Sequence, residues 1–255
     1  MLWTSAREEQ AWNVHALEQR VDRPRFQVWR YRAPAVVLGC SQRADPAVLQ
    51  RAQAYGIEIV ERRSGGGAVL VGPWMVGVSV ALPPDHPLCG TSLVGSYRWL
   101  GLLHARALRS VGVEAHARPP DQTHPQRRDD PLTWACFGSF SPWEVASRDG
   151  RKLVGLAQVR RSGGILMVGG TLVDHPPWAL LTGVLSRTVG EADALQARAA
   201  ACAEYAGARV GAHDIAAAIE RELTDTLRLD SGADTDPITG QACEPAGGRG
   251  SDEQE

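Results

Sequence analysis

The chain has 255 residues, with 27 basic and 29 acidic side chains and a formal net charge of −2. A chain of this length can bury a sizeable core without help from metals or disulfides. The balanced charge argues against a dedicated nucleic-acid binder, which needs clustered excess Lys and Arg. Among the basic residues only Lys152 is a lysine, and the other 26 are arginine. Because lysine is normally common on surfaces, this exception is a candidate for a specific role.

Several features predict a cytoplasmic protein without a membrane segment. The longest apolar stretches, at 75–82 and 165–168, are far shorter than the roughly 20 residues that a bilayer needs. The N-terminal segment has no apolar core of the signal-peptide type. The five cysteines include no CxxC pair, and the seven histidines show no paired spacing, so neither a disulfide framework nor a metal site is expected.

The first part of the chain alternates helical and strand patterns. Ser5 and Glu8 form a capping-box pattern at the start of the first helix. Alternating or continuous apolar runs bounded by Gly and Pro indicate the strands. We predict helices at 5–21 and 46–55, strands at 26–31, 35–38 and 57–60, and a hairpin around Gly72 and Pro73.

The second part contains the longest predicted helix, over 91–112, with Thr91 or Ser92 as its cap. A proline-rich, charged surface loop at 117–131 follows. We then predict three strands joined by turns at Asp149-Gly150 and at 162–164, and helices at 177–185 and 212–229. This order indicates an α+β fold with mixed, mainly antiparallel sheets. The expected organisation is a catalytic domain at 1–190, a helical extension at 191–229 and a disordered tail at 230–255.

Three consecutive glycines, Gly65 to Gly67, follow the strand at 57–60 and two arginines. Glycine leaves backbone N–H groups uncovered, so such a loop can hold a phosphate or a carboxylate. A simple turn between strands is the alternative, because three glycines alone are a weak motif.

Two further residues are candidates for chemistry. Lys152 should start a strand, where a compact ammonium can bridge several oxygens in a way that arginine cannot; the alternative is that the only lysine has no special role. Cys136 follows the proline-rich loop within TWACFGSF. It is either a buried structural cysteine or a nucleophile activated by a nearby base or cation.

Taken together, these motifs resemble the catalytic domain shared by lipoate–protein ligases, octanoyltransferases and biotin–protein ligases, and lipoate–protein ligase A-like proteins most of all. The resemblance covers about residues 5–190 and rests on WRYRAPAVVLGCSQ, VERRSGGGAV, ACFGSFSPWEV and GRKLVGLAQVRRSGGILMVGGTLV. The pairing of RxSGGGAV with a downstream GRKLxGxAQxR is the specific part of the pattern.

The resemblance implies an enzyme that uses ATP with Mg²⁺ to activate lipoate or octanoate as an acyl-adenylate. The acyl group then passes to a lysine of a lipoyl carrier, such as a glycine-cleavage H-like protein or a dehydrogenase E2 domain. Lys152 would contact the acyl carbonyl and the α-phosphate. The implied substrate and ATP contacts are Arg62, Arg63, Ser64, Gly65, Gly66, Gly67, Ala68, Val69, Gly155, Ala157, Gly170 and Thr171.

The sequence departs from the family pattern at two positions where a histidine is usual, which are occupied by Val71 and Gly169. The ACF segment resembles the cysteine-dependent octanoyltransferases, in which the cysteine takes the acyl group as a thioester. The uninterrupted glycine triplet favours the ATP-dependent ligase. The alternatives are a Cys136-dependent octanoyl or lipoyl transferase, and a non-catalytic protein that binds an acylated carrier. The region after residue 190 is too short for the accessory domain of long bacterial ligases, so a separate accessory protein is a further hypothesis.

Overall fold

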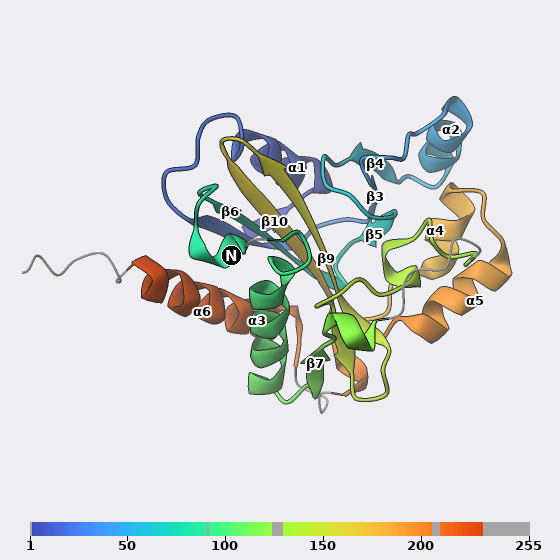
Figure 1. Cartoon of the computed structure of the whole chain (residues 1–255). Coiled ribbons are helices and arrows are strands. Elements are labelled where there is room, and N and C mark those ends of the chain that lie inside the picture. Colours follow the sequence, from blue (N-terminus) through green and yellow to red (C-terminus); the bar gives the residue numbers. More distant parts are fainter. Residues whose placement is uncertain (1, 91, 124–129, 206–209, 232–255) are drawn as a thin grey trace, which may run out of the picture.

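The computed structural model describes residues 2–90, 92–123, 130–205 and 210–231. Its large sheet crosses the middle of the molecule (Figure 1). The strands lie side by side in the order β1 (Leu2–Thr4), β2 (Arg25–Tyr31), β6 (Met75–Leu82), β10 (Gly164–Leu172), β9 (Lys152–Arg161), β8 (Val145–Ser147) and β7 (Ala115–Ala117). Within this described sheet the β1–β2 pair is parallel and the other pairs are antiparallel. The predicted α+β class with mainly antiparallel sheets is therefore confirmed.

A small second sheet has the order β4 (Glu58–Glu61), β3 (Ala35–Leu38) and β5 (Val69–Val71), and in it β3 pairs parallel with β4. The hairpin predicted around Gly72 and Pro73 is wrong, because the strands on either side of this turn belong to different sheets. β5 pairs with β3, whereas β6 pairs with β2 and β10. The turn carries the chain from the small sheet to the large one, so residues before and after it face a common space between the two sheets.

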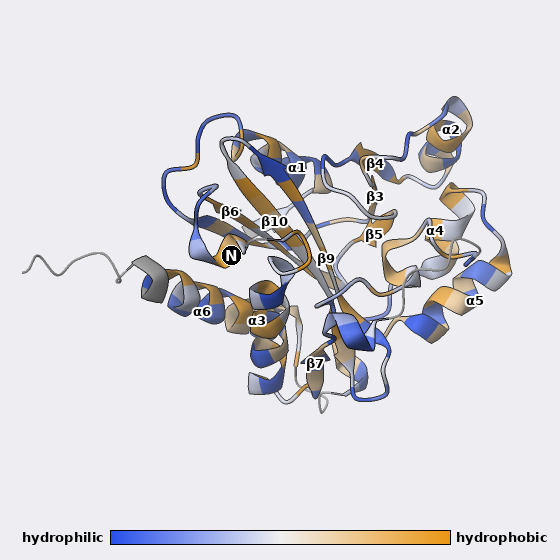
Figure 2. Cartoon of the chain, in the orientation of Figure 1, coloured by the Kyte–Doolittle hydropathy of each residue, from blue (hydrophilic) through white to orange (hydrophobic). Residues whose placement is uncertain are grey.

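Helices cover both faces of the large sheet. The helices are α1 (Ala6–His15), α2 (Pro46–Ala54), α3 (Tyr97–Ser110), α4 (Trp178–Val184), α5 (Val189–Arg198) and α6 (Ala212–Ser231). One core cluster joins α3 and α6 to one face of the large sheet, and a second joins the opposite face to the small sheet and to α4 and α5. Hydrophobic and hydrophilic residues alternate along α3 and α6, as expected for helices with one buried side (Figure 2).

The first helix is shorter than predicted and buries a different face. It begins after the predicted cap, Ser5, whose capping box with Glu8 is present, and it ends at His15 rather than near residue 21. Its buried positions include the polar residues Glu9 and Asn13, whereas Ala11 is exposed. The apolar-stripe prediction fails here because this helix covers partly polar pockets with Glu9 and Asn13, while its Ala6 and Trp12 pack against the core.

The long helix α3 begins at Tyr97, with Ser96 as its cap residue, so the predicted start near residue 91 is wrong. Ser92 lies before the helix, and Leu93 is exposed rather than part of a core stripe. Thr91 lies outside the described residues. The helix α6 packs against α3 and shares its core cluster, so the predicted C-terminal extension contributes to the same hydrophobic core.

The remaining predicted strands and helices are confirmed to within about two residues. The sequence patterns did not indicate β1, β7 or a separate helix α5. Most of the predicted tail, and part of the proline-rich loop, lie outside the described residues. In the described part of the chain, no helix combines the length and apolar character needed to cross a membrane.

Candidate active site

The glycine loop between β4 and β5 is held by an arginine. Arg62 Nη2 donates hydrogen bonds to the carbonyl oxygens of Gly65, at 2.8 Å, and Gly67, at 2.9 Å. Gly66 lies between them with a positive φ of 93°, which favours glycine. The loop therefore curves around the buried guanidinium of Arg62 with carbonyl oxygens directed at it, and its use as a phosphate or carboxylate site stays a prediction.

The segment that carries Cys136 lies beside this loop and forms two backbone hydrogen bonds with it. Ala68 N–H donates to the Trp134 carbonyl at 2.7 Å, and Cys136 N–H donates to the Ala68 carbonyl at 2.8 Å. A Cβ atom at Gly67 would lie 2.5 Å from the Trp134 carbonyl oxygen, too close for any side chain. The close approach explains why a glycine stands at this position, and it fixes the backbone of Cys136 beside the loop.

Lys152 is buried directly below the Cys136 turn, with 2% of its surface exposed. Its ammonium donates to the carbonyl oxygens of Cys136, at 2.7 Å, and Ser139, at 2.9 Å. It also forms an ion pair with Glu144, with Nζ 2.6 Å from Oε2. An ammonium has three N–H donors, so each donor of Lys152 has an acceptor in this structure. Lys152 thus anchors the turn that carries the cysteine.

Glu144 is the buried partner of Lys152, and the sequence patterns did not indicate it as a site residue. Its carboxylate is 2% exposed and accepts backbone N–H bonds from Ser141, at 2.6 Å, and Leu156, at 2.9 Å, besides the lysine contact. A buried lysine needs an anionic partner, so an acid in the WEV segment just before GRK was the signal available in the sequence.

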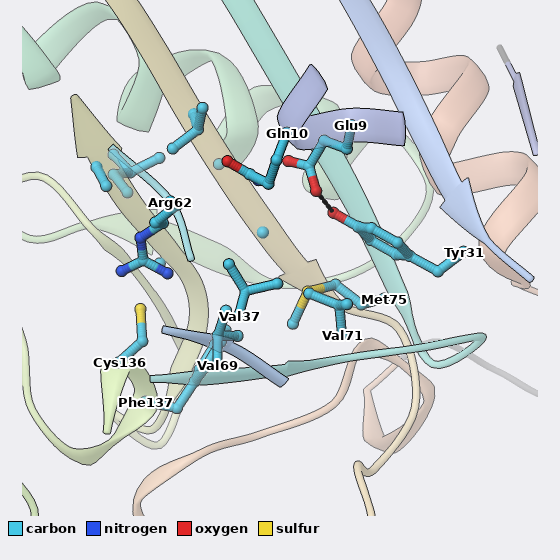
Figure 3. Close-up of a pocket in the computed structure, with 16 residues that line it drawn as sticks. Glu9, Gln10, Tyr31, Val37, Arg62, Val69, Val71, Met75, Cys136 and Phe137 are labelled. Atoms are coloured by element: carbon cyan, nitrogen blue, oxygen red, sulfur yellow. Dashed lines mark hydrogen bonds between the residues drawn. The ribbon is translucent and has the colours of Figure 1, made fainter. Parts of the chain in front are cut away.

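Cys136 opens onto a pocket between the two sheets, which we call the inner pocket (Figure 3). Its empty volume is about 470 Å³, part of it open to solvent. The small sheet supplies its apolar roof, from Val37, Val69 and Val71, and the large sheet supplies Met75. The mainly apolar lining suits a hydrocarbon chain.

The end of the inner pocket away from Cys136 is polar. Tyr31 donates a hydrogen bond to Glu9 Oε2 at 2.8 Å (Figure 3). Burial raises the pKa of the Glu9 carboxyl, and the Tyr31 hydrogen bond and the more distant Arg62 partly oppose that effect. Burial and the neighbouring Glu9 raise the pKa of Tyr31 well above its usual range. The sequence patterns indicated neither residue as part of a site, and Glu9 in particular was unexpected because an acid on a helix normally faces solvent.

A second, wider pocket lies on the other side of the cysteine, and we call it the outer pocket. Its empty volume is about 890 Å³, part of it open to solvent, and its lining is largely polar. Arg62, Cys136 and Leu156 line both pockets. A group bound at the cysteine can therefore extend an apolar part inward and a polar part outward.

The structure brings most of the predicted site residues together. Arg62, Val69, Gly155, Ala157 and Gly170 line the inner pocket, and Gly66, Gly67 and Lys152 line the outer one, with Cys136 between.

The other predicted residues lie elsewhere. Arg63 and Ser64 line a separate small pocket beside α1, and Gly65 and Ala68 lie outside both pockets. Thr171 also lies outside them, because it pairs with Val76 and so shares the sheet face covered by α3 and α6.

The two positions where the family usually has histidine have different surroundings. Val71 lines the inner pocket. A Cβ atom at Gly169 would lie 3.0 Å from the ring of His104, a fully buried residue of α3. Burial lowers the pKa of His104 to about 4, and its Nδ1 bonds to the Leu100 carbonyl at 2.8 Å. The imidazole fills the space that a side chain at position 169 would need.

The half-buried thiol of Cys136 therefore lies between a glycine loop and a mainly apolar pocket, beside a mixed sheet. The chain matches the model of the lipoyl protein ligase A/B catalytic domain over residues 5–224, and it belongs to that family.

Among sequence relatives, octanoyltransferase LipM of Kyrpidia tusciae is 33% identical over 216 residues, covering 82% of this chain and 78% of the relative. LipM of an Exiguobacterium species is 33% identical over 149 residues, covering 58% of this chain and 53% of that relative. The chain thus spans about half the length of this second relative.

Solved structures share the fold. A putative lipoate protein ligase from Thermoplasma acidophilum with bound lipoic acid has a TM-score of 0.63 and 20% identity, over 89% of this chain and 84% of that chain. A lipoate-protein ligase A bound with ATP has a TM-score of 0.64 and 21% identity, over the same shares of both chains.

Proposed function

We propose that the protein is a cysteine-dependent acyltransferase of lipoyl metabolism, which moves an octanoyl group from a thioester donor to a lysine of a carrier domain. The observation that carries this proposal is the position of Cys136. Its backbone is held by the glycine loop and by Lys152, and its side chain stands where the apolar pocket meets the polar one. The LipM relatives, which are named octanoyltransferases, support the same reading.

The reaction would proceed in two balanced steps. The Cys136 thiol loses its proton and its sulfur attacks the carbonyl carbon of the donor thioester. The donor C–S bond breaks, and the donor takes up that proton and leaves as a thiol. The ε-amine of a carrier lysine then attacks the new thioester. An amide forms, the Cys136–acyl bond breaks, and the proton released by the amine returns to the cysteine. The acyl chain would occupy the inner pocket and the carrier lysine would enter through the outer pocket.

In these steps Lys152 would mainly hold the turn that carries Cys136 in place. Its positive charge is balanced by Glu144 and its donors are directed at the Cys136 and Ser139 carbonyl oxygens. To donate to an acyl carbonyl, as the family resemblance implies, the ammonium would have to exchange one of these contacts. Arg62 lines both pockets, and among the described residues it has no carboxylate partner within ion-pair distance. It is the cation best available to an acyl oxygen.

ATP-dependent ligation of lipoate or octanoate is the second candidate. The uninterrupted glycine triplet and the roomy, polar outer pocket favour it. The described lining fits Mg²⁺ less well, since Glu144 is its single acid and its two oxygens already accept three hydrogen bonds. A non-catalytic carrier-binding role is the third candidate, and the proposed accessory protein would matter mainly for the ligase.

One experiment separates these functions. The protein is incubated with octanoyl-coenzyme A and a lipoyl carrier domain, without nucleotide, and both proteins are analysed by intact-mass spectrometry. We expect one octanoyl group on the enzyme and its transfer to the carrier, both lost in Cys136→Ser and kept in Cys40→Ser, whose thiol is exposed. Carrier modification only with ATP and free acid, and undiminished in Cys136→Ser, would establish the ligase instead. Carrier binding without modification would favour the third candidate.

A further inference from the structure

Three glycines form a row across the centre of the large sheet. Gly170 of β10 is the direct partner of Gly77 on β6 and of Gly155 on β9. Directly paired residues of neighbouring strands face the same side of a sheet. The row faces the inner pocket, because Gly155 and Gly170 line it. Three adjacent positions without side chains leave a groove that runs across the strands.

A different functional group lies over each glycine of this row. A Cβ atom at Gly155 would lie 3.0 Å from Cys136 Sγ, and one at the middle glycine would lie 3.1 Å from Met75 Sδ. A Cβ atom at the third glycine would lie 2.4 Å from the Tyr31 hydroxyl. The thiol, the thioether and the phenol therefore follow one another along the groove. Figure 3 shows Met75 between the other two.

The spacing of strands places Met75 in the path of an acyl chain. Neighbouring strands lie about 4.8 Å apart, so Met75 Sδ is roughly one strand spacing from the thiol along the row, and the Tyr31 hydroxyl is roughly two. A chain that starts at Cys136 and follows the groove meets Met75 before it reaches Tyr31. Met75 is 2% exposed in this structure.

Among the apolar side chains that line the inner pocket, Met75 has the most rotatable bonds. Val37, Val69 and Val71 of the roof are β-branched and belong to a strand pair, which restricts their rotamers. Methionine is unbranched, has three rotatable bonds and adapts to irregular space. We propose that Met75 is the residue that selects the length of the acyl chain, by turning away from Gly170 when the chain enters and limiting how far it extends. This inference rests on the proposed transfer through Cys136.

The test measures the length preference of Cys136 acylation. Wild type and variants react in single turnover with octanoyl-, decanoyl- and dodecanoyl-coenzyme A, without nucleotide, and the enzyme thioester is quantified by intact mass. In Met75→Ala we expect the ratio of dodecanoyl to octanoyl acylation rates to rise about tenfold or more, the size of effect that one or two methylenes have in an apolar pocket. Because both rates are measured on the same preparation, their ratio does not depend on the fraction of active protein.

Met167→Ala is the matched control. Met167 is fully buried on β10, but it belongs to the core cluster on the opposite face, against α3 and α6. The same atoms are removed from a core, and the length ratio should stay at the wild-type value.

Gly170→Ala keeps the test informative if Met75→Ala folds poorly, because it changes the same contact from the other side. In Gly170→Ala the new methyl group would press on Met75, so octanoyl acylation should slow. Where the double variants fold, adding Met75→Ala to Gly170→Ala should restore the rate of octanoyl acylation more fully than adding Met75→Leu. If every folded Met75 and Gly170 variant keeps the wild-type ratio of dodecanoyl to octanoyl acylation rates, the role of Met75 is overturned while the proposed transfer still stands. A wild type that takes up no acyl group overturns the proposed transfer, and the inference with it.

Discussion

Glu144 and Lys152 form a buried ion pair, with Nζ 2.6 Å from Oε2 and each residue 2% exposed, directly beneath the turn that carries Cys136. The carboxylate also fixes two backbone N–H groups, and the ammonium fixes two carbonyl oxygens. The pair therefore joins β9 to the 136–141 segment through fully occupied hydrogen bonds. It connects the two features on which the proposed chemistry depends, the fixed cysteine and the single lysine.

The first prediction concerns the stability of this pair. Glu144→Gln leaves the lysine charge buried without an anion, so we expect the free energy of unfolding to fall by about 3–5 kcal/mol. Lys152→Ala should also destabilise the fold, because Glu144 then loses its cation. Urea denaturation of the single variants and of Glu144→Gln with Lys152→Met provides the measurement. We expect the double variant to recover much of the stability and none of the transfer activity. A loss below about 1 kcal/mol in both single variants, within the range of ordinary substitutions, would contradict this account.

The second prediction concerns the geometry of Lys152. The ammonium meets one carboxylate and two carbonyl oxygens within 2.6–2.9 Å. A planar guanidinium is larger and carries five donors in a fixed fork, so Lys152→Arg should displace the Cys136 turn. We expect acyl transfer to fall by about 100-fold or more, as when an active-site group is misplaced by an ångström. The rate of Cys136 acylation, measured on protein whose folding is checked by circular dichroism, tests this. An arginine variant of wild-type rate would mean that charge alone is required.

The third prediction concerns the glycine loop. In Gly67→Ala the new methyl group would lie 2.5 Å from the Trp134 carbonyl oxygen and 2.7 Å from the Ala135 carbonyl carbon. The segment that carries Cys136 would have to move away from Ala68, so we expect transfer to fall by about 100-fold. Gly65→Ala is the comparison, because a Cβ atom there meets no atom within 4 Å. Its loss of activity should be much smaller. Equal effects of the two substitutions would show that loop conformation, rather than the contact with Trp134, controls activity.

The fourth prediction concerns the pH dependence of stability. Burial lowers the pKa of His104 to about 4, from 6.5 when it is exposed. The unfolded chain therefore binds this proton more readily than the folded one does. The free energy of unfolding is unaffected by protonation of this histidine above pH 6.5, and it falls as the pH drops from 6.5 toward 4. We expect the loss to be about 3 kcal/mol across this range.

The measurement is urea denaturation of wild type and His104→Leu between pH 7 and pH 4. Leucine cannot be protonated, and it also replaces His104 Nε2, a buried atom without a hydrogen-bond partner among the described residues. The difference in free energy of unfolding between the two proteins should change in favour of the variant as the pH falls. A difference that stays constant over this range would show that the histidine is accessible to protons in the folded state.

The sequence by itself determined the fold class and most of the elements. Alternating apolar residues place β2 and β9, the Asp149-Gly150 turn joins β8 to β9, and the capping box at Ser5 starts α1, because these features depend on neighbours along the chain. The motifs around the glycine triplet and Lys152 were enough to indicate the family.

Tertiary structure alone decided which residues meet. The Gly72–Pro73 turn reads as a hairpin from local pattern, yet it joins two sheets because β5 finds its partner in β3. Glu144 becomes the partner of Lys152 because the segment before β8 packs against β9. Gly77, Gly155 and Gly170 become one groove only through strand register. Hydrophobic periodicity reports which side of an element is buried, but it carries no information on which distant element covers that side. That is set by pairing and packing across the whole chain.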